Sequence, residues 1–307
     1  MVVFAVPGSK TYVNRHYKNN PRSFLNVSIT GSTCQLMCSH CRGFLLKDMI
    51  DINDFHEDEK IIKTSAGRFM QVIDYFGEDN VCGMLVSGGF DSSGRLPLDV
   101  KIMDELAKVK ELKADSVKVI MHLGFINAEE IRLLQNSAID GVLVNIFSDM
   151  YSIKEVYNLK GLSPHDFYMN LRNIKNAGIK VSPHLILGLG CRGNIEGEFI
   201  SIDEISKIGT DSLVFAIEKK LTKNHRNDYK EVRIQDIVRL YEYARKLMPQ
   251  TPLALGCARP PGAFSEELEM ELIKRGIDSI AFPSEKAIDF ALENNLSFCF
   301  KEQCCAF

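Results

Sequence analysis

The feature that most restricts the fold of this 307-residue chain is a regular alternation of short apolar runs with longer segments of helical periodicity. This order is typical of parallel strands joined by helical crossovers. Eight strands are predicted, at residues 24–29, 81–87, 117–123, 141–147, 180–187, 212–217, 253–257 and 279–282. Because eight parallel strands can close a barrel, we predict an α/β fold of the TIM-barrel type with a complete set of eight strand–helix pairs.

The helical segments carry the start and stop signals that such crossovers need. Ser163 and Pro164 favour the beginning of a helix, and Gly178 favours its end. No Gly/Ser linker, repeat or low-complexity tract divides the sequence pattern. One domain is therefore predicted, with a lead-in of residues 1–22 that covers one end of the barrel, the barrel over residues 23–295 and a cysteine-containing tail of residues 296–307.

Composition argues against several classes of protein. With 45% hydrophobic residues and no apolar run near the roughly 18 residues of a membrane span, no membrane association is expected. The net charge of -3 indicates no broad basic surface, so nucleic acid is not an expected partner. The first residues lack the basic start of a secretory signal. The nine cysteines are therefore expected to be metal ligands or reactive thiols in a reducing, cytoplasmic compartment.

Three of the cysteines, Cys34, Cys38 and Cys41, follow the first predicted strand with the spacing C-x3-C-x2-C. Three thiolates on one short loop can bind a soft metal centre and leave a coordination position without a protein ligand. A Cys3His zinc site that includes His40 is an alternative, because zinc accepts tetrahedral sulfur and nitrogen ligands. It would require His40 to turn onto the same ion as its neighbour in the sequence.

This cysteine motif resembles the signature of the radical S-adenosylmethionine (radical SAM) superfamily. The resemblance implies a barrel of the radical SAM type in which the three cysteines hold a [4Fe-4S] cluster and S-adenosylmethionine chelates the unique iron. Reductive cleavage of that cofactor then gives a 5′-deoxyadenosyl radical, so a low-potential electron donor is an implied partner. The family usually has an aromatic residue just before the third cysteine, and His40 takes that place here. His40 is therefore a candidate cofactor contact.

The end of the second predicted strand also resembles the superfamily. Ser87, Gly88 and Gly89 match an element that binds the amino group of the methionine moiety through its backbone. Glycine suits this role because it lets the backbone approach a ligand closely. Phe90 replaces the acidic residue of the family, so only the backbone role is implied for this chain.

The fourth and fifth predicted strands supply further candidates. Asn145 and Asp149 are placed to hydrogen-bond a ribose or a carboxylate, with Asp149 as the preferred ribose partner. Capping of the following helix is the alternative for Asp149. Ile186 and Gly188 match the biotin-synthase-related branch, in which this segment packs on the adenine. His184 stands where that branch has a glycine, either as a cofactor contact or as a hydrogen-bonded structural residue.

The chain differs from biotin synthase itself. That enzyme holds a second cluster with cysteines on its third and fifth strands, and the matching positions here are Ile120 and Ser182. These strands therefore lack the ligands for such a cluster. The tail brings three more thiols, Cys299, Cys304 and Cys305, which could ligate metal, receive sulfur or belong to a flexible reduced terminus.

Two residues after the seventh predicted strand are candidates for the substrate side. Arg259 would project a cation toward the mouth of the barrel, with Cys257 beneath it. An ordinary salt bridge is the alternative for Arg259.

Three functions follow from these patterns. The cysteine motif, the fifth-strand segment and residues 255–260 resemble the small-subunit type of archaeal-type two-component lipoyl synthases. That resemblance implies radical sulfur insertion into the octanoyl chain of a lipoyl carrier protein or peptide, with a second radical SAM subunit as partner. Another cofactor-building reaction or a methylation by the same radical chemistry is an alternative. A zinc-stabilised barrel that acts as a binding protein is the alternative from a different class.

Overall fold

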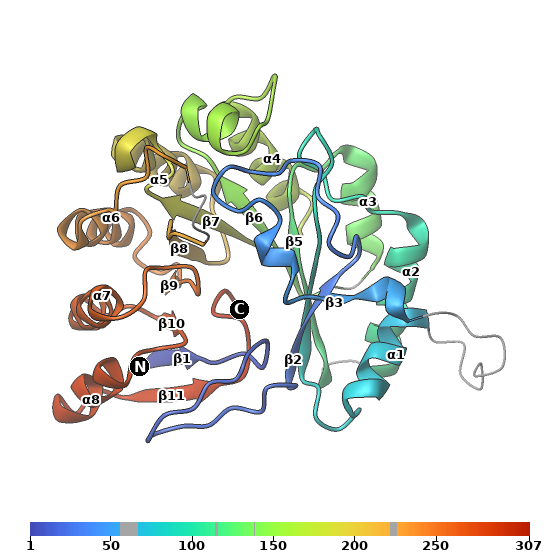
Figure 1. Cartoon of the computed structure of the whole chain (residues 1–307), viewed down its shortest axis with the longest axis horizontal. Helices are drawn as coiled ribbons and strands as arrows, with labels where there is room; N and C mark the ends of the chain where they lie inside the picture. The colour runs from blue at the N-terminus through green and yellow to red at the C-terminus, as the bar shows by residue number, and fades with distance from the viewer. Residues whose placement is uncertain (56–66, 114–115, 138, 222–225) are drawn as a thin grey trace.

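The computed structural model describes residues 1–55, 67–113, 116–137, 139–221 and 226–307. In these residues eleven parallel strands form one sheet, in the order β11-β1-β10-β9-β8-β7-β6-β5-β4-β2-β3. The sheet curves like a half-barrel (Figure 1). Its strands are β1 (Val2–Ala5), β2 (Phe24–Ser28), β3 (Ile50–Asp51), β4 (Gly83–Ser87), β5 (Lys118–Leu123), β6 (Gly141–Ile146), β7 (Val181–Leu187), β8 (Leu213–Ile217), β9 (Leu253–Leu255), β10 (Ser279–Ala281) and β11 (Phe298–Lys301).

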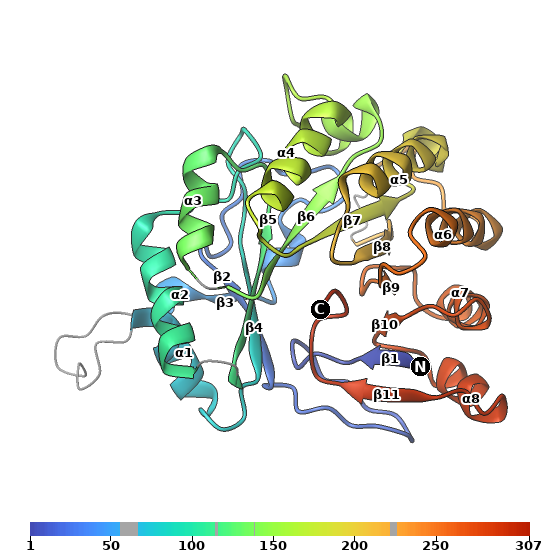
Figure 2. The same cartoon turned by 180° about the vertical axis from the view of Figure 1, so that it is seen from behind.

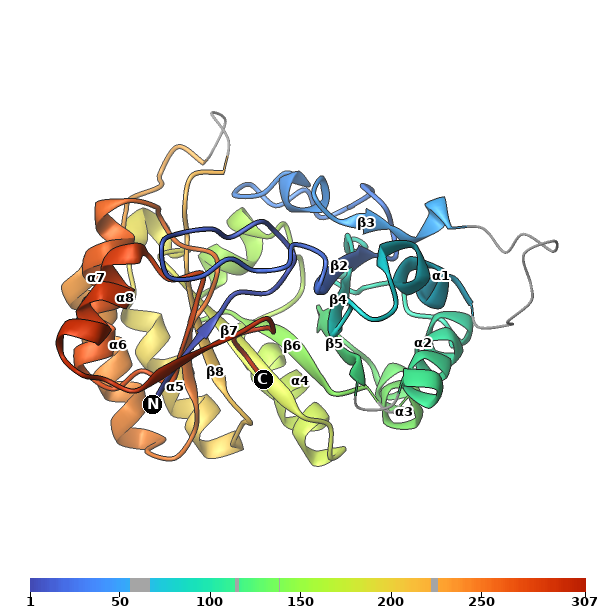
Figure 3. The ribbon, with the colours of Figure 1, turned by 90° about the horizontal axis from the view of Figure 1, so that it is seen from below.

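Helices follow one another around the outer side of this sheet (Figures 1 and 3). They are α1 (Gly67–Phe76), α2 (Val100–Lys113), α3 (Ala128–Asn136), α4 (Pro164–Asn176), α5 (Glu196–Ile208), α6 (Ile234–Leu247), α7 (Ala263–Lys274) and α8 (Glu285–Glu293), with the short turns η1 (Phe44–Leu46), η2 (Ile52–Asp54), η4 (Ser152–Val156) and η5 (Cys191–Gly193). The helix predicted to begin at Ser163 and Pro164 is α4, and Gly178 follows it with a φ of 75°. No helix of the described ranges has both the length and the apolar character needed to cross a membrane.

The eight predicted strand–helix pairs are confirmed. The predicted strands correspond to β2 and to β4 through β10, with ends that differ by two residues at most. Each of these strands is followed by one of the helices α1 to α8, so the α/β, TIM-like fold class is also confirmed. Within the described ranges no strand ladder joins β3 to β11, and the sheet therefore keeps two edges.

Two further strands come from the predicted lead-in and tail. Val3 of β1 pairs with Ser279 of β10 on one side and with Cys299 of β11 on the other. Residues 2–5 thus belong to the sheet, which corrects the expectation that residues 1–22 only cover an end of the barrel. The partners of β1 lie almost a whole chain length away, so the local pattern of β1 cannot reveal the pairing.

The rest of the lead-in lies beside the ends of β10 and β11. The hydroxyl of Tyr12 donates to the carbonyl of Pro283 over 2.8 Å, just beyond the carboxyl end of β10. The ring of Tyr17 stacks on Phe300 with 4.3 Å between the centroids. This segment therefore reaches the edge of the sheet where barrels of this type carry their active sites.

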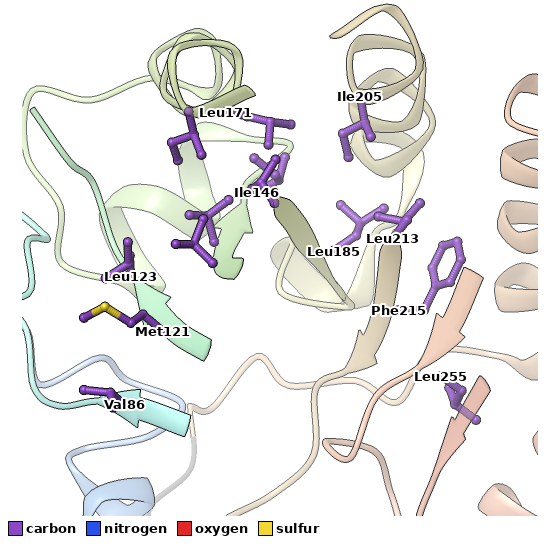
Figure 4. Packing of buried hydrophobic residues seen from close by; sticks show 14 of the residues in the cluster. Val86, Met121, Leu123, Ile146, Leu171, Leu185, Ile205, Leu213, Phe215 and Leu255 are labelled. Atoms are coloured by element: carbon purple, nitrogen blue, oxygen red, sulfur yellow. The ribbon is translucent and has the colours of Figure 1, made fainter. Parts of the chain in front are cut away.

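Apolar side chains pack on both faces of the sheet. The larger cluster fills the space between the sheet and the helices, where Ile146 lies near Leu171 of α4, Leu185 lies on the side of Ile205 of α5, and Met121 lies between Leu123 and Val86 (Figure 4). Successive residues of a strand point to opposite faces of the sheet. The strand residues next to Met121, Ile146 and Leu185 therefore point to the inner face. The inner cluster consists of Phe24, Ile120, Leu143, Val214, Ala254 and Ala306, with the partly buried Leu85, Cys304, Cys305 and Phe307 packed against it.

Residues of the tail thus close one part of the inner face. The hydroxyl of Ser212 donates to the carbonyl of Ala306 over 2.6 Å, and Ala306 is only 4% exposed. In Figures 1 and 2 the C-terminal segment lies within the curve of the sheet. The alternative of a flexible terminus is therefore wrong for these residues, because burial of Ala306 and the side chain of Phe307 holds them against the strands. We call the inner cluster, including residues 304–307, the lower inner layer.

Candidate metal and cofactor site

The cysteine loop follows β2 and packs on the loop that follows β4. The amide of Gln35 donates to the carbonyl of Phe90 over 2.8 Å, and the amide of Gly89 donates to Oγ1 of Thr30 over 2.7 Å. A Cβ on Gly89 would lie 1.9 Å from the carbonyl oxygen of Thr33 and 2.6 Å from the Cα of Cys34. Only glycine allows this contact, so Gly89 holds the cysteine loop at the carboxyl edge of the sheet.

The three thiols lie on one loop. Sγ of Cys34 is 3.9 Å from the carbonyl of Phe90, and Sγ of Cys38 is 3.9 Å from the carbonyl of Tyr157. Burial raises the pKa of the Cys38 thiol well above its ordinary value, and Cys34 and Cys41 raise it further. A bound cation would relieve this penalty, because metal ligation stabilises the thiolate.

The donor set fits a soft metal centre. Three cysteines of one loop are the ligands that iron–sulfur clusters take. In the described parts of the chain, no three Cys, His, Asp or Glu side chains are arranged to hold a metal ion. Ligation by Cys34, Cys38 and Cys41 therefore stays a prediction that the loop's position supports.

His40 packs against an aromatic wall beside the cysteines. Its ring centroid is 4.8 Å from that of Tyr157, and Tyr157 in turn contacts Phe147 at 4.3 Å. His40 thus occupies the place of an aromatic residue in the packing, as its position in the motif implies. This orientation supports the role of an aromatic substitute over that of a fourth zinc ligand.

A polar layer covers the inner face next to the lower inner layer. It consists of Ser87, His122, Asn145 and His184. Each of these residues lies two positions beyond an inner-facing residue of the same strand, so it points to the same face of the sheet. Oγ of Ser87 donates to the carbonyl of His122 over 2.9 Å, and Nε2 of His122 lies 3.2 Å from Oδ1 of Asn145. We call these four residues the upper inner layer.

The two histidines of the upper inner layer are neutral at ordinary pH. Their ring centroids are 5.5 Å apart, and the ring of Phe90 lies 6.5 Å from that of His122. Burial lowers the pKa of His184 to about 3, and His122 acts in the same direction. Burial also lowers the pKa of His122. Among the described residues, the buried Nδ1 of His184 has no hydrogen-bond partner.

His122 is a further candidate site residue, which the sequence prediction does not include. It points to the same face of the sheet as Ile120, and the register pairs Asn145 with His184 on the next strands. The signal that could have identified it is the shared inner-facing position of two histidines near strand ends. That comparison needs the strand register, which the sequence pattern leaves open.

The other predicted cofactor contacts have specific neighbours. Ile186 points to the inner face and pairs in register with Ala216. Gly188 has a φ of 91°, which favours glycine, and a Cβ there would lie 2.5 Å from Val232. A Cβ on Gly88 would lie 2.8 Å from Oγ1 of Thr30. These glycines are therefore needed for local packing, and their cofactor contacts stay predictions.

Asp149 caps the helical turn that follows β6. Its Oδ1 accepts from the amide of Ser152 over 2.8 Å, and its Oδ2 accepts from the hydroxyl of Ser152 over 2.6 Å. This is the capping alternative, and the ribose contact of Asp149 stays a prediction. Burial raises the pKa of the nearby Glu198 to about 7, and the charge of Asp149 adds to this effect.

A buried ion-pair network joins three segments at the carboxyl ends of the strands. The sequence prediction does not include this network. The guanidinium of Arg226 binds both carboxylate oxygens of Glu218 over 2.7 and 2.6 Å and donates to the carbonyl of Gly188 over 2.7 Å. Its Nη1 also contacts Asp228, which accepts from the hydroxyl of Tyr151 over 2.6 Å. Glu218 directly follows the apolar β8. A polar residue at that position is the only local signal in the sequence that could indicate the network.

Arg259 does not project toward the mouth of the barrel. It is 6% exposed, and its Nη2 lies 2.5 Å from Oε1 of Glu269 in α7. Its other donors bind Oγ of Ser265 over 3.0 Å and the carbonyl of Gly256 over 2.6 Å. The salt-bridge alternative is therefore the correct one, because a buried guanidinium needs a charged partner and α7 supplies it. Cys257 is exposed beside it, and its substrate role stays a prediction.

Solved structures resemble this chain in fold. They include SuiB from Streptococcus suis, with 17% identity over 84% of this chain and 55% of that chain and a TM-score of 0.53. The hydrogenase maturase HydG from Carboxydothermus hydrogenoformans has 16% identity over 94% of this chain and 70% of that chain, with a TM-score of 0.58. An HMG-CoA lyase from Brucella melitensis has 9% identity over 91% of this chain and 94% of that chain, with a TM-score of 0.53.

These likenesses show the fold alone, since one fold can carry unrelated chemistry. The chain spans about half the length of SuiB. No family model and no curated protein matches the sequence. HydG is a hydrogenase maturase, whereas the third neighbour is a lyase. The chain therefore has an α/β, TIM-like fold.

Proposed function

We propose that this chain is a radical SAM enzyme that binds a [4Fe-4S] cluster through Cys34, Cys38 and Cys41. The observation that carries the proposal is the position of the cysteine loop, which packs on Gly89 at the carboxyl edge of the sheet. Active sites of TIM-like barrels lie at this edge. The solved complex of SuiB with S-adenosylmethionine supports the same cofactor for this fold.

The residues around the loop have complementary tasks in this proposal. The backbone at Ser87, Gly88 and Gly89 binds the amino group of S-adenosylmethionine, and Ile186 and Gly188 contact its adenine. When bound, the cluster supplies an electron from a low-potential donor that cleaves the cofactor to a 5′-deoxyadenosyl radical. The lower inner layer excludes water from the inner face and so protects a radical from side reactions.

The proposed substrate is a protein-bound octanoyl chain, into which sulfur is inserted together with a second radical SAM subunit. An uncharged acyl chain suits an inner face that combines an apolar layer with two neutral histidines. SuiB has been solved with its precursor peptide SuiA, which supports a peptide-borne substrate for this fold. All nine cysteines are free thiols, consistent with the reducing cytoplasm that an iron–sulfur enzyme needs.

The radical function is tested by anaerobic purification followed by iron and sulfide analysis. We expect about four irons per chain, as a single [4Fe-4S] cluster requires. Addition of S-adenosylmethionine and dithionite should then release 5′-deoxyadenosine. Zinc without iron, or a cluster without cofactor cleavage, would contradict the proposal.

The substrate is tested separately. The reconstituted chain is incubated with an octanoyl-lysyl peptide, alone and with a candidate partner subunit, and the products are analysed by mass spectrometry. The same peptide with an unmodified lysine is the control. Absence of a thiolated octanoyl product in both incubations, with 5′-deoxyadenosine still formed, would reject lipoyl synthesis and leave the radical function standing.

A further inference from the structure

Two adjacent thiols lie on the inner face of the sheet, away from the cysteine loop. Residues 304–307 form a turn in which the amide of Phe307 donates to the carbonyl of Cys304 over 3.4 Å. The ring of Phe307 covers Gly141, where a Cβ would lie 2.5 Å from it. With the Ser212 contact to Ala306, this turn places Cys304 and Cys305 against the lower inner layer.

The two thiols differ in their protonation. A hydrogen bond from the thiol of Cys305 lowers the pKa of Cys304. The same hydrogen bond and burial raise the pKa of Cys305 well above its ordinary value. Cys304 is therefore the nucleophile of the pair, because the thiolate is the reactive form of cysteine.

The surroundings favour sulfur chemistry over metal binding at this pair. Ile120 contributes an apolar side chain to the same layer, and Ser182 contributes a hydroxyl that is hydrogen-bonded to Ser212 over 2.6 Å. Among the described residues no third ligand joins the pair in a metal-binding arrangement. A sulfur acceptor needs only one nucleophilic thiolate and one group that stabilises it.

We propose that Cys304 is a sulfur-carrying thiol that accepts sulfane sulfur from a persulfide donor. The Cys304 thiolate attacks the outer sulfur of the donor R–S–SH, a new S–S bond forms, the donor's S–S bond breaks, and R–S⁻ leaves. The product is Cys304–S–SH, and no external oxidant or reductant is consumed. Use of this sulfur in a radical insertion rests on the proposed function, whereas the loading step does not.

The adjacency of the two cysteines helps to retain the sulfur. Release as HS⁻ by attack of the neighbouring thiol would require a disulfide between Cys304 and Cys305. Consecutive Cα atoms are about 3.8 Å apart, which is shorter than the roughly 4.4–6.8 Å that disulfides usually span. Cys305 therefore acts as a positioning residue that donates a hydrogen bond to the Cys304 thiolate.

The test uses the anaerobically purified full chain and glutathione persulfide as the probe, without S-adenosylmethionine or reductant. After alkylation, trypsin cleaves beyond Lys301 and releases residues 302–307, whose only cysteines are Cys304 and Cys305. We expect this peptide to gain one sulfur atom faster than the peptides that carry the exposed Cys82 and Cys191. The C304S variant should not gain it. The C305A variant should load more slowly, because the Cys304 thiolate loses the hydrogen bond that lowers its pKa.

Three results would overturn the proposal. One is equal loading of the peptides with Cys82, Cys191 and the pair. Another is wild-type loading of the 302–307 peptide in the C304S variant, with circular dichroism showing a native fold. The third is bound iron or zinc that is lost in both the C304S and C305A variants while the cluster of the Cys34 motif remains. Loading without cofactor cleavage would support this inference and reject only the proposed function.

Discussion

The upper and lower inner layers share one face of one sheet, yet they differ in chemistry. The lower inner layer is apolar and is covered by residues 304–307. The upper inner layer lies beside the cysteine loop and keeps polar atoms, including the unpartnered Nδ1 of His184 among the described residues. The same strands therefore supply apolar packing in the lower layer and polar groups in the upper layer. The contrast separates the part that holds the sheet and the tail together from the part whose polar atoms face the proposed cofactor site.

The largest loss of activity is expected from a substitution in the cysteine loop, which lies beside the upper inner layer. The Cys38→Ala variant should form no detectable 5′-deoxyadenosine, because a three-cysteine cluster site loses a ligand. Cys82→Ala is the matched control, since that thiol is exposed, and it should retain wild-type activity. Full cleavage by the Cys38 variant would show that the loop does not bind the cluster.

The next effect concerns the ion pair that holds the carboxyl end of β8. Glu218→Gln removes the carboxylate that accepts two hydrogen bonds from the buried Arg226 and leaves it paired with Asp228, so it should cost about 3 kcal/mol in the free energy of unfolding. Glu266→Gln, at an exposed pair with Lys286, is the control and should cost less than about 1 kcal/mol. Urea denaturation compares the two, and equal small losses would remove the structural role of Arg226.

A smaller loss is expected in the lower inner layer. Gly141→Ala places a Cβ against the ring of Phe307 and should destabilise the fold by about 1–3 kcal/mol through overpacking. The same substitution in a Phe307→Ala background should cost clearly less, because the ring is gone. A double-mutant cycle measured by denaturation tests this. Equal costs in both backgrounds would mean that residue 307 does not cover Gly141.

His184 makes stability depend on pH from within the upper inner layer. Burial lowers its pKa in the folded protein to about 3, whereas the ordinary value of 6.5 applies to the unfolded chain. As pH falls below 6.5, the unfolded state gains the proton first, so stability is lost between these two pKa values. The contribution is about 2 kcal/mol between pH 8 and pH 5.

The His184→Gln variant should remove this contribution and flatten the profile of unfolding free energy against pH. His122 has a lowered pKa as well and will retain part of the slope. An unchanged profile in the variant would place His184 in a solvated environment and contradict the neutral character of the layer.

The smallest effect concerns Asp149. The Asp149→Ala variant should lose about 1 kcal/mol of stability, as expected for a lost helix cap. If Asp149 also binds the ribose, the KM for S-adenosylmethionine should rise while kcat changes less. An unchanged KM would leave the cap as its only role.

Local signals account for what could be predicted at the cysteine loop and along the strands. The spacing of Cys34, Cys38 and Cys41 lies within one loop, and Gly89 stands in the next strand–loop unit. Polar residues that end apolar strands, such as Asn145, are recognisable for the same reason. Asp149 shows the limit of this reasoning, because one carboxylate can serve a cap or a ligand and only its contact with Ser152 reveals the cap.

The sequence by itself determined the eight strand–helix pairs and the soft-metal motif after the first of them, because both depend on residues close together in the chain. The tertiary structure decided which partners buried groups have. It paired Arg259 with Glu269, placed β1 between β10 and β11, and brought Cys304 and Cys305 onto the inner face. These contacts depend on the curvature and register of the whole sheet, which no local periodicity specifies.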